Sequence, residues 1–171
     1  MRHRLARIPG TSYAIAAGFS CGAAVSFTPF LGLHFLLAAL LAWIIGANIL
    51  TSAMGTIVGN PWTFPVILPA TYYVGCWLLG IRAADDFFGQ INEALERYSL
   101  MEILRSPMAT FGPFLQSTIL PMFIGGMILG AITWIILYWP LEKLVREYKH
   151  KRYVKRRVAL KRRGKLNEEN E

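Results

Sequence analysis

Charge is what this sequence lacks over most of its length. No Asp, Glu, Lys or Arg occurs in the 74 residues from Ile8 to Ile81, or in the 36 residues from Ser106 to Leu141. A water-soluble protein exposes a face of each helix or strand, and such faces carry charged residues. A bilayer instead requires about 20 apolar residues for each crossing helix. The lack of charge excludes a water-soluble globular fold and predicts an all-α integral membrane protein.

Cysteine, histidine and intramembrane carboxylates are also scarce, which argues against an enzyme. Cys21 and Cys76 lie in apolar sequence and are interpreted as buried small residues rather than a disulfide. The three histidines are scattered, and neither uncharged stretch holds a carboxylate that could act as a general acid or base. The one catalytic alternative is a pair of His34 with Ser26 or Thr63. We expect no catalytic activity, no metal and no cofactor.

Glycine and proline divide the first uncharged stretch into short helices. We predict helices over 13–27, 33–47, 49–58 and 62–79, with breaks at Thr28-Pro29 and at Gly59-Asn60-Pro61. Several of these pieces are too short to span a bilayer alone. Their pattern is typical of broken or re-entrant helices, whose free backbone groups must be covered by protein or water.

The second half of the chain differs in charge from one segment to the next. Residues 82–105 hold three basic and five acidic residues with apolar residues at helical spacing, which predicts an amphipathic surface helix. Residues 114–138 predict a full span, and from Glu142 to Lys165 the chain carries twelve Lys or Arg against two Glu. The predicted organisation is a membrane core with two Pro-broken helices (1–81), a surface linker (82–105), a C-terminal transmembrane helix (106–141) and a basic cytoplasmic tail (142–171).

The basic residues at both ends predict the orientation. Cytoplasmic segments carry an excess of Lys and Arg, so both termini are expected in the cytoplasm. This requires an even number of crossings. We predict about four, with three before the net-acidic linker and one after it.

Polar residues at the two breaks are the candidate binding site. His34 is the one titratable imidazole in the long uncharged run, and ionisable groups in lipid often mark function. The N-termini of helices that begin at a break present free N–H groups suited to an anion. The alternatives are structural: His34 hydrogen-bonds only a stray carbonyl or an interface headgroup, and Asn60 only caps a helix. We predict that the breaks lie in contact, and the candidate substrate-binding residues are His34, Asn60, Thr63, Pro29, Gly32, Pro61 and Asn48.

Two sequence patterns suggest how the helices pack. Each break lies between two apolar segments, which is the pattern of an inverted repeat around a central site. Small residues recur every four positions, and such stripes let helix backbones approach closely, either within one chain or between two. The stripes are Ala14, Gly18, Gly22 and Ser26, then Gly55 with Gly59, and Gly126 with Gly130.

The motifs at the breaks resemble a known family. Pro29-Phe30-Leu31-Gly32-Leu33-His34 and Asn60-Pro61-Trp62-Thr63-Phe64-Pro65, with flanking 16–19 and 73–75, resemble domain-of-unknown-function family 2062, which consists of small bacterial inner-membrane proteins. The resemblance implies a multi-pass location in that membrane and no settled activity. Some members carry glycosyltransferase domains, which points to envelope lipid or polysaccharide.

Two functions follow as hypotheses. The first is a small membrane transporter or lipid-handling (translocation) protein with a polar site near His34 and Asn60. The alternative is a non-catalytic membrane scaffold for an envelope-synthesis partner. As partners we expect membrane lipids, whose anionic headgroups bind the basic tail, and no nucleic acid; a homo-oligomer is left open.

Overall fold

The computed structural model describes residues 10–30, 32–97, 112 and 114–168, and every regular element in them is helical. The all-α fold is therefore confirmed. Within the described residues, one stretch (Leu115–Lys155) is long and apolar enough to cross a membrane, and the other apolar helices are shorter. Four crossings remain a prediction.

The elements are α2 (Ser12–Val25), α3 (His34–Ile44), α4 (Ile49–Gly55), the 3-10 helix η1 (Thr56–Val58), α5 (Phe64–Leu79), α6 (Phe87–Arg97), the π-helix η2 (Leu115–Ile119) and α9 (Leu120–Glu168).

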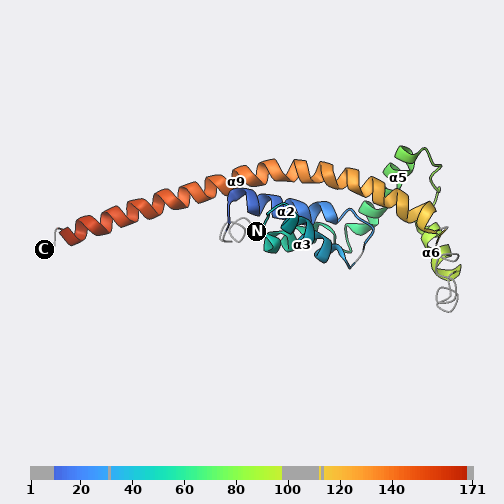
Figure 1. Cartoon of the computed structure of the whole chain (residues 1–171), viewed down its shortest axis with the longest axis horizontal. Helices are drawn as coiled ribbons and strands as arrows, with labels where there is room; N and C mark the ends of the chain where they lie inside the picture. The colour runs from blue at the N-terminus through green and yellow to red at the C-terminus, as the bar shows by residue number, and fades with distance from the viewer. Residues whose placement is uncertain (1–9, 31, 98–111, 113, 169–171) are drawn as a thin grey trace.

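Helix α9 forms one long side of the molecule, and α2 lies along it in the opposite direction (Figure 1). Gly126 and Gly130 of α9 meet the end of α2, because a methyl group on either would contact the carbonyl oxygen of Phe27 or Ala24. At the other end of α2, the Nζ of Lys149 donates to the carbonyl oxygen of Gly10. The start of the described chain therefore lies beside the basic part of α9.

Helices α2 and α4 pack backbone to backbone and run in the same direction. Gly18 faces Thr51, Gly22 faces Gly55, and a methyl group on either glycine would overlap atoms of α4. Small residues at four-residue spacing allow this approach. The predicted packing within the chain is thus confirmed for this stripe. The inverted repeat is wrong here, since an inverted pair would run in opposite directions.

Helix α3 turns back along α2 and completes a short hairpin. The hydroxyl of Tyr13, at the start of α2, donates to the carbonyl oxygen of Ile45 just after α3 (2.9 Å). The Asn48 amide then donates to the Ala14 carbonyl oxygen (2.9 Å), so α4 starts level with α2. Because α2 has 14 residues and α-helices rise about 1.5 Å per residue, this first arm of the hairpin is about 21 Å long.

Helix α5 follows the second break and crosses the beginning of α9. Gly75 lies against the carbonyl oxygen of Pro121, and Gly125 lies against that of Thr71, so these helices also run in opposite directions. The loop after α5 is held by Tyr72, whose hydroxyl accepts from the Ala84 amide (3.1 Å). These contacts place α6 at the end of the molecule opposite the tail (Figure 1).

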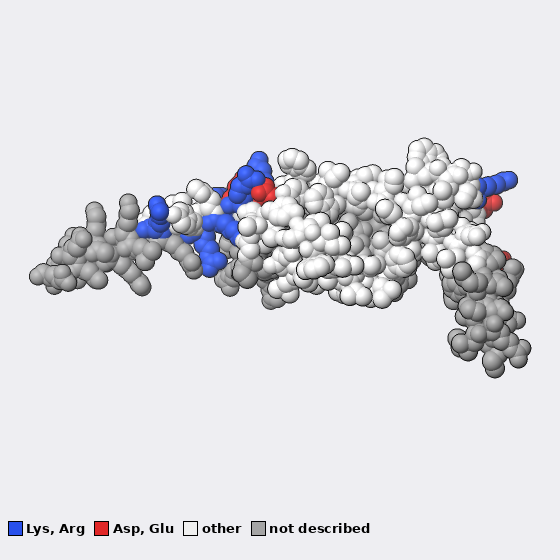
Figure 2. Space-filling model, in the orientation of Figure 1, with Lys and Arg blue, Asp and Glu red and all other residues white. Residues whose placement is uncertain are grey.

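Charged side chains lie at the two ends of the molecule. Figure 2 shows a body without described charges, between basic and acidic residues of α9 at one end and a smaller charged group at the other. Arg82, Asp85 and Asp86 follow α5, whereas Glu142 begins the charged part of α9. Within the segment predicted over 82–105, a helix is confirmed for Phe87–Arg97 (α6); residues 82–86 precede it, residues 98–105 lie outside the described chain, and the position on the membrane surface remains a prediction.

Candidate functional site

The two breaks lie against each other, as predicted. Beside Gly59, a methyl group would come within 2.7 Å of Ser26 Cβ, and the Ser26 hydroxyl donates to the Thr56 carbonyl oxygen (3.5 Å). Further along, the rings of His34 and Phe64 meet edge to face with centroids 6.5 Å apart. The contact follows from the parallel course of α2 and α4, which brings both chains to their breaks at the same level.

The second break satisfies its own backbone. Asn60 Oδ1 accepts from the amides of Trp62 (2.9 Å) and Thr63 (3.1 Å), and Asn60 Nδ2 donates to the Ile57 carbonyl oxygen (3.0 Å). The Thr63 hydroxyl is close to the carbonyl oxygens of Val58 (2.6 Å) and Asn60 (3.0 Å) and accepts from the Asn60 amide (3.0 Å). These side chains act as turn and cap groups. Their use in the turn favours the structural interpretation of Asn60 and Thr63.

The first break is held by its histidine. The Gly32 amide donates to Nδ1 of His34 (3.2 Å), and Gly32 has a φ of +89°, a conformation that glycine adopts without strain. An imidazole nitrogen that accepts carries no proton, so the neutral ring has its hydrogen on Nε2. The ring also lies 4.5 Å from that of Phe35. His34 therefore has one nitrogen engaged in the turn and a second one that can donate.

The remaining predicted site residues are divided between two places. Pro29 is partly buried and Pro61 is exposed, each within its break. Asn48 lies elsewhere: its Oδ1 accepts from the Thr51 amide (3.1 Å) and caps α4. The backbone N–H of Asn48 donates to the carbonyl oxygen of Ala14. Ala14 lies twelve residues, or about 18 Å of helix, before Ser26. The structure thus brings six of the seven residues together and separates Asn48 from them.

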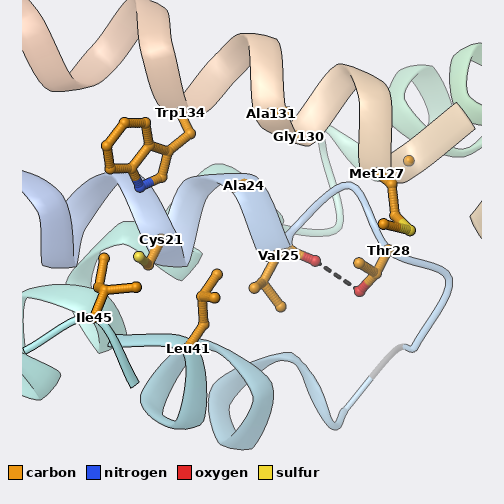
Figure 3. Close-up of a pocket in the computed structure, with 11 residues that line it drawn as sticks. Cys21, Ala24, Val25, Thr28, Leu41, Ile45, Met127, Gly130, Ala131 and Trp134 are labelled. Atoms are coloured by element: carbon orange, nitrogen blue, oxygen red, sulfur yellow. Dashed lines mark hydrogen bonds between the residues drawn. The ribbon is translucent and has the colours of Figure 1, made fainter. Parts of the chain in front are cut away.

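An apolar groove that the sequence interpretation missed lies beside the breaks. It has a volume of about 350 Å³ and runs along the second half of α2, with α3 on one side and α9 on the other. Figure 3 shows Trp134 at one end, its indole nitrogen toward Cys21, and Thr28 with Met127 at the other. The Thr28 hydroxyl donates to the Val25 carbonyl oxygen (2.7 Å), so this polar lining group is already satisfied. The groove is suited to an apolar ligand.

Small residues create the groove. Ala24, Gly126, Gly130 and Ala131 supply little side-chain volume, while Trp134 is large. In the sequence, the four-residue spacing of Gly126 and Gly130 indicates close helix packing and gives no sign of a groove. Both roles are present, because these glycines contact α2 and also line the groove.

Chemistry that needs several ionisable groups has no support in the described part of the chain. No three His, Cys, Asp or Glu side chains converge there as metal ligands would. Ser20 and Ser52 are buried, and their hydroxyls have no hydrogen-bond partner. What the arrangement offers is an apolar groove that ends beside a set of turn groups and one imidazole.

Comparison with known proteins gives a family and no activity. A family described as an uncharacterized protein conserved in bacteria (DUF2062) matches residues 1–153. No curated protein and no solved structure matches the chain.

Proposed function

The chain belongs to the bacterial family DUF2062, and from that premise we propose that it is a small multi-pass membrane protein that handles lipid. The apolar groove between α2, α3 and α9 carries this proposal. We propose that the groove holds a lipid acyl chain and that the protein catalyses no chemical step. The location is the bacterial inner membrane.

The distribution of charge supports the membrane location. The described body between the two charged ends shows apolar side chains on its surface, among them Trp43, Trp77 and Trp139. Tryptophan is enriched where a membrane meets water. Among the described residues, one helix is long and apolar enough to cross a bilayer.

The directions of the helices support two crossings and one re-entrant hairpin. Helix α2, at about 21 Å, is shorter than a hydrocarbon core of about 30 Å, and α3 has fewer residues still. The stretch from α4 to α5 (Ile49–Leu79) continues past the hairpin, and α9 returns in the opposite direction. Lys149 donates to the Gly10 carbonyl oxygen, and this contact supports a topology in which both termini are cytoplasmic, as the positive-inside rule requires.

The composition and width of the groove favour an acyl chain. Its lining is apolar apart from the Thr28 hydroxyl, which is already bonded, and the Trp134 indole nitrogen, which lies toward the Cys21 thiol. An α-helix is about 10–12 Å across, so a groove with a volume of only about 350 Å³ is too small to hold one. Thr28 also belongs to the first break, so a lipid whose chain lies in the groove would have the polar groups of the breaks within reach. This proximity supports translocation of lipid rather than transport of a small polar solute.

A photoreactive phospholipid tests the proposal. We would incorporate full-length protein into vesicles with a phospholipid that carries a diazirine near the end of its acyl chain, and map the adducts by mass spectrometry. Adducts are expected on α2, α3 and α9 around the groove. Ala131→Trp should fill the groove and reduce these adducts several-fold. Ile132→Trp is the matched control, since Ile132 is exposed and does not line the groove. Equal labelling of both variants would mean ordinary surrounding lipid and would refute the proposal.

A scaffold function is the second candidate, and one feature favours it. Helix α9 continues well beyond the rest of the molecule as a charged helix that ends at Glu168 (Figure 1). A helix that projects from the membrane could hold an envelope-synthesis partner. A scaffold predicts that Ala131→Trp has no effect on function even where it displaces lipid.

A further inference from the structure

The apolar groove is closed at its end toward the basic tail. There the ring of Trp134 stacks on that of Tyr138, with centroids 4.9 Å apart and an angle of 7° between the planes. Tyr138 in turn meets Tyr13 edge to face (6.2 Å), and the Tyr13 hydroxyl donates to the carbonyl oxygen of Ile45 (2.9 Å). These contacts join α2, α9 and the turn after α3, so the three walls of the groove converge at this end.

Past this closure, α2 and α9 pack directly on each other. Ile15 and Val145 form a buried apolar contact in which each is 1% exposed. One turn further along α9, Lys149 bonds the carbonyl oxygen of Gly10. Lys149 is therefore separated from the groove by packed apolar side chains.

The end of the groove at the breaks is less obstructed. Met127 lines it there and is 58% exposed, and a methionine side chain is unbranched and flexible enough to move aside. Trp134 is half-buried and held by its stack on Tyr138. Thr28 belongs to the first break, whose His34 has an Nε2–H that can donate. Space for a headgroup and a hydrogen-bond donor therefore lie on the break side.

We infer that the groove takes its lipid in one orientation, with the methyl end of the acyl chain against Trp134 and the headgroup at the breaks. This rests on the proposed function and on termini in the cytoplasm. From Met127 to Trp134 the groove extends about 10 Å along α9, whereas a chain that fills half of a hydrocarbon core is about 15 Å long. The carbons next to the headgroup therefore project past Met127 toward the breaks.

The orientation identifies the leaflet that supplies the lipid. With the termini in the cytoplasm, the breaks lie farther from the cytoplasmic surface than Trp134 does. A lipid with its headgroup at the breaks belongs to the leaflet that faces away from the termini. A lipid of the cytoplasmic leaflet would lie the other way round, with the carbons near its ester beside Trp134 and its methyl end toward the breaks.

Two photoreactive phospholipids test the orientation. Each would be added to full-length protein in phosphatidylglycerol vesicles, one with a diazirine at the methyl end of its acyl chain and the other with a diazirine next to the ester. Methyl-end adducts are expected on Cys21, Ile45 and Trp134, and ester-end adducts on Thr28 and Met127. Each set should exceed the opposite assignment several-fold.

Removal of the end wall gives a second readout. In Trp134→Ala the chain can reach further, so methyl-end adducts on Tyr13 and Tyr138 should rise several-fold over the natural protein. Ile136→Ala is the matched control, since Ile136 is 63% exposed on α9 and does not line the groove, and it should leave the adducts unchanged. The order of adducts in the natural protein needs no variant, so a folding defect of Trp134→Ala would not affect that readout.

The outcomes separate this inference from the proposed function. The reverse order of adducts, or equal labelling of both ends by both probes, would overturn the orientation, and lipid handling would still be judged by the effect of Ala131→Trp. A folded Trp134→Ala with unchanged adducts would overturn Trp134 as the end wall. No adducts around the groove with either probe would overturn the proposed function and the orientation together.

Discussion

The imidazole ring of His34 meets the phenyl ring of Phe64 edge to face, 6.5 Å between centroids, although 30 residues separate them in the sequence. This contact joins the start of α3 to the start of α5. It exists because α2 and α4 run side by side in the same direction, so that both breaks fall at one level. The first prediction concerns the strength of this contact.

A double-mutant cycle should detect coupling between these rings. His34→Ala and Phe64→Ala are expected to be non-additive in the free energy of unfolding by about 0.5–1 kcal/mol, as for other edge-to-face pairs. The measurement is denaturant unfolding of the purified protein in detergent. Trp43→Ala with Phe64→Ala is the control cycle, because Trp43 lies near the other end of α3. Additive changes for His34 and Phe64 would mean that the breaks are not in contact.

Asn60 should prove to be a structural residue. Asn60→Ala removes an acceptor for two amides and a donor to Ile57, so it should lower stability by about 0.5–2 kcal/mol, as loss of a cap does. Asn60→Asp keeps the acceptor and should recover part of this loss. Thermal unfolding and acyl-chain labelling would be measured together. Loss of labelling in a variant of normal stability would instead show that Asn60 binds the ligand.

The composition and the positions of proline and glycine predict much of this fold. The predicted helix over 49–58 coincides with α4 and η1, and the other three of the first uncharged stretch differ from the structure by up to three residues at their ends. The predicted span over 114–138 is too short, because α9 continues through Pro140 to Glu168. Proline and glycine act locally, so their effect on the boundaries is readable from the sequence. The breaks at Pro29 and Pro61 were placed for the same reason.

The direction of the helices and the groove were not predictable. Whether α3 turns back or continues depends on how α2 packs on α4, which involves residues 33 apart such as Gly18 with Thr51. The groove requires small residues on two helices that are over 100 residues apart, for example Ala24 and Ala131. A single sequence carries no signal for such pairs. Asn48 was grouped with the breaks because it is polar, but its place in the fold is the opposite end of α2.

The contact between α2 and α4 should tolerate no added volume. In Gly22→Ala, the new methyl group would overlap the Ser52 carbonyl oxygen, which is backbone and cannot rotate away. Overpacking of this kind costs about 1–3 kcal/mol. The thermal midpoint in detergent should fall accordingly. Gly112→Ala is the control, since no described atom lies within 4 Å of the added methyl group. Equal stability of both variants would contradict the close approach.

The basic tail should retain anionic lipid. Truncation after Glu147 removes ten of the twelve Lys and Arg between residues 142 and 165, since only Lys143 and Arg146 remain. Each such charge near an anionic surface contributes about 1 kcal/mol. We expect weaker binding to vesicles that contain phosphatidylglycerol, and a similar loss for the full chain in high salt because of screening. A tail of equal length with Gln in place of Lys and Arg is the control. If this control bound as well as the natural tail, charge would not be the cause.

Accessibility of the hairpin tip should separate two crossings from four. Single cysteines at Leu33, Glu93 and Lys151 would be introduced after both native cysteines are replaced, and intact cells would be treated with a membrane-impermeant thiol reagent. Glu93 is exposed on α6 and should react, whereas Lys151 should react only after the cells are opened. Four crossings place the segment between α2 and α3 outside, so Leu33 would react like Glu93. In a re-entrant hairpin, whose helices α2 and α3 are each shorter than the hydrocarbon core, Leu33 lies within the hydrocarbon instead and should resist the reagent from both sides. Reaction at Leu33 from outside would restore four crossings.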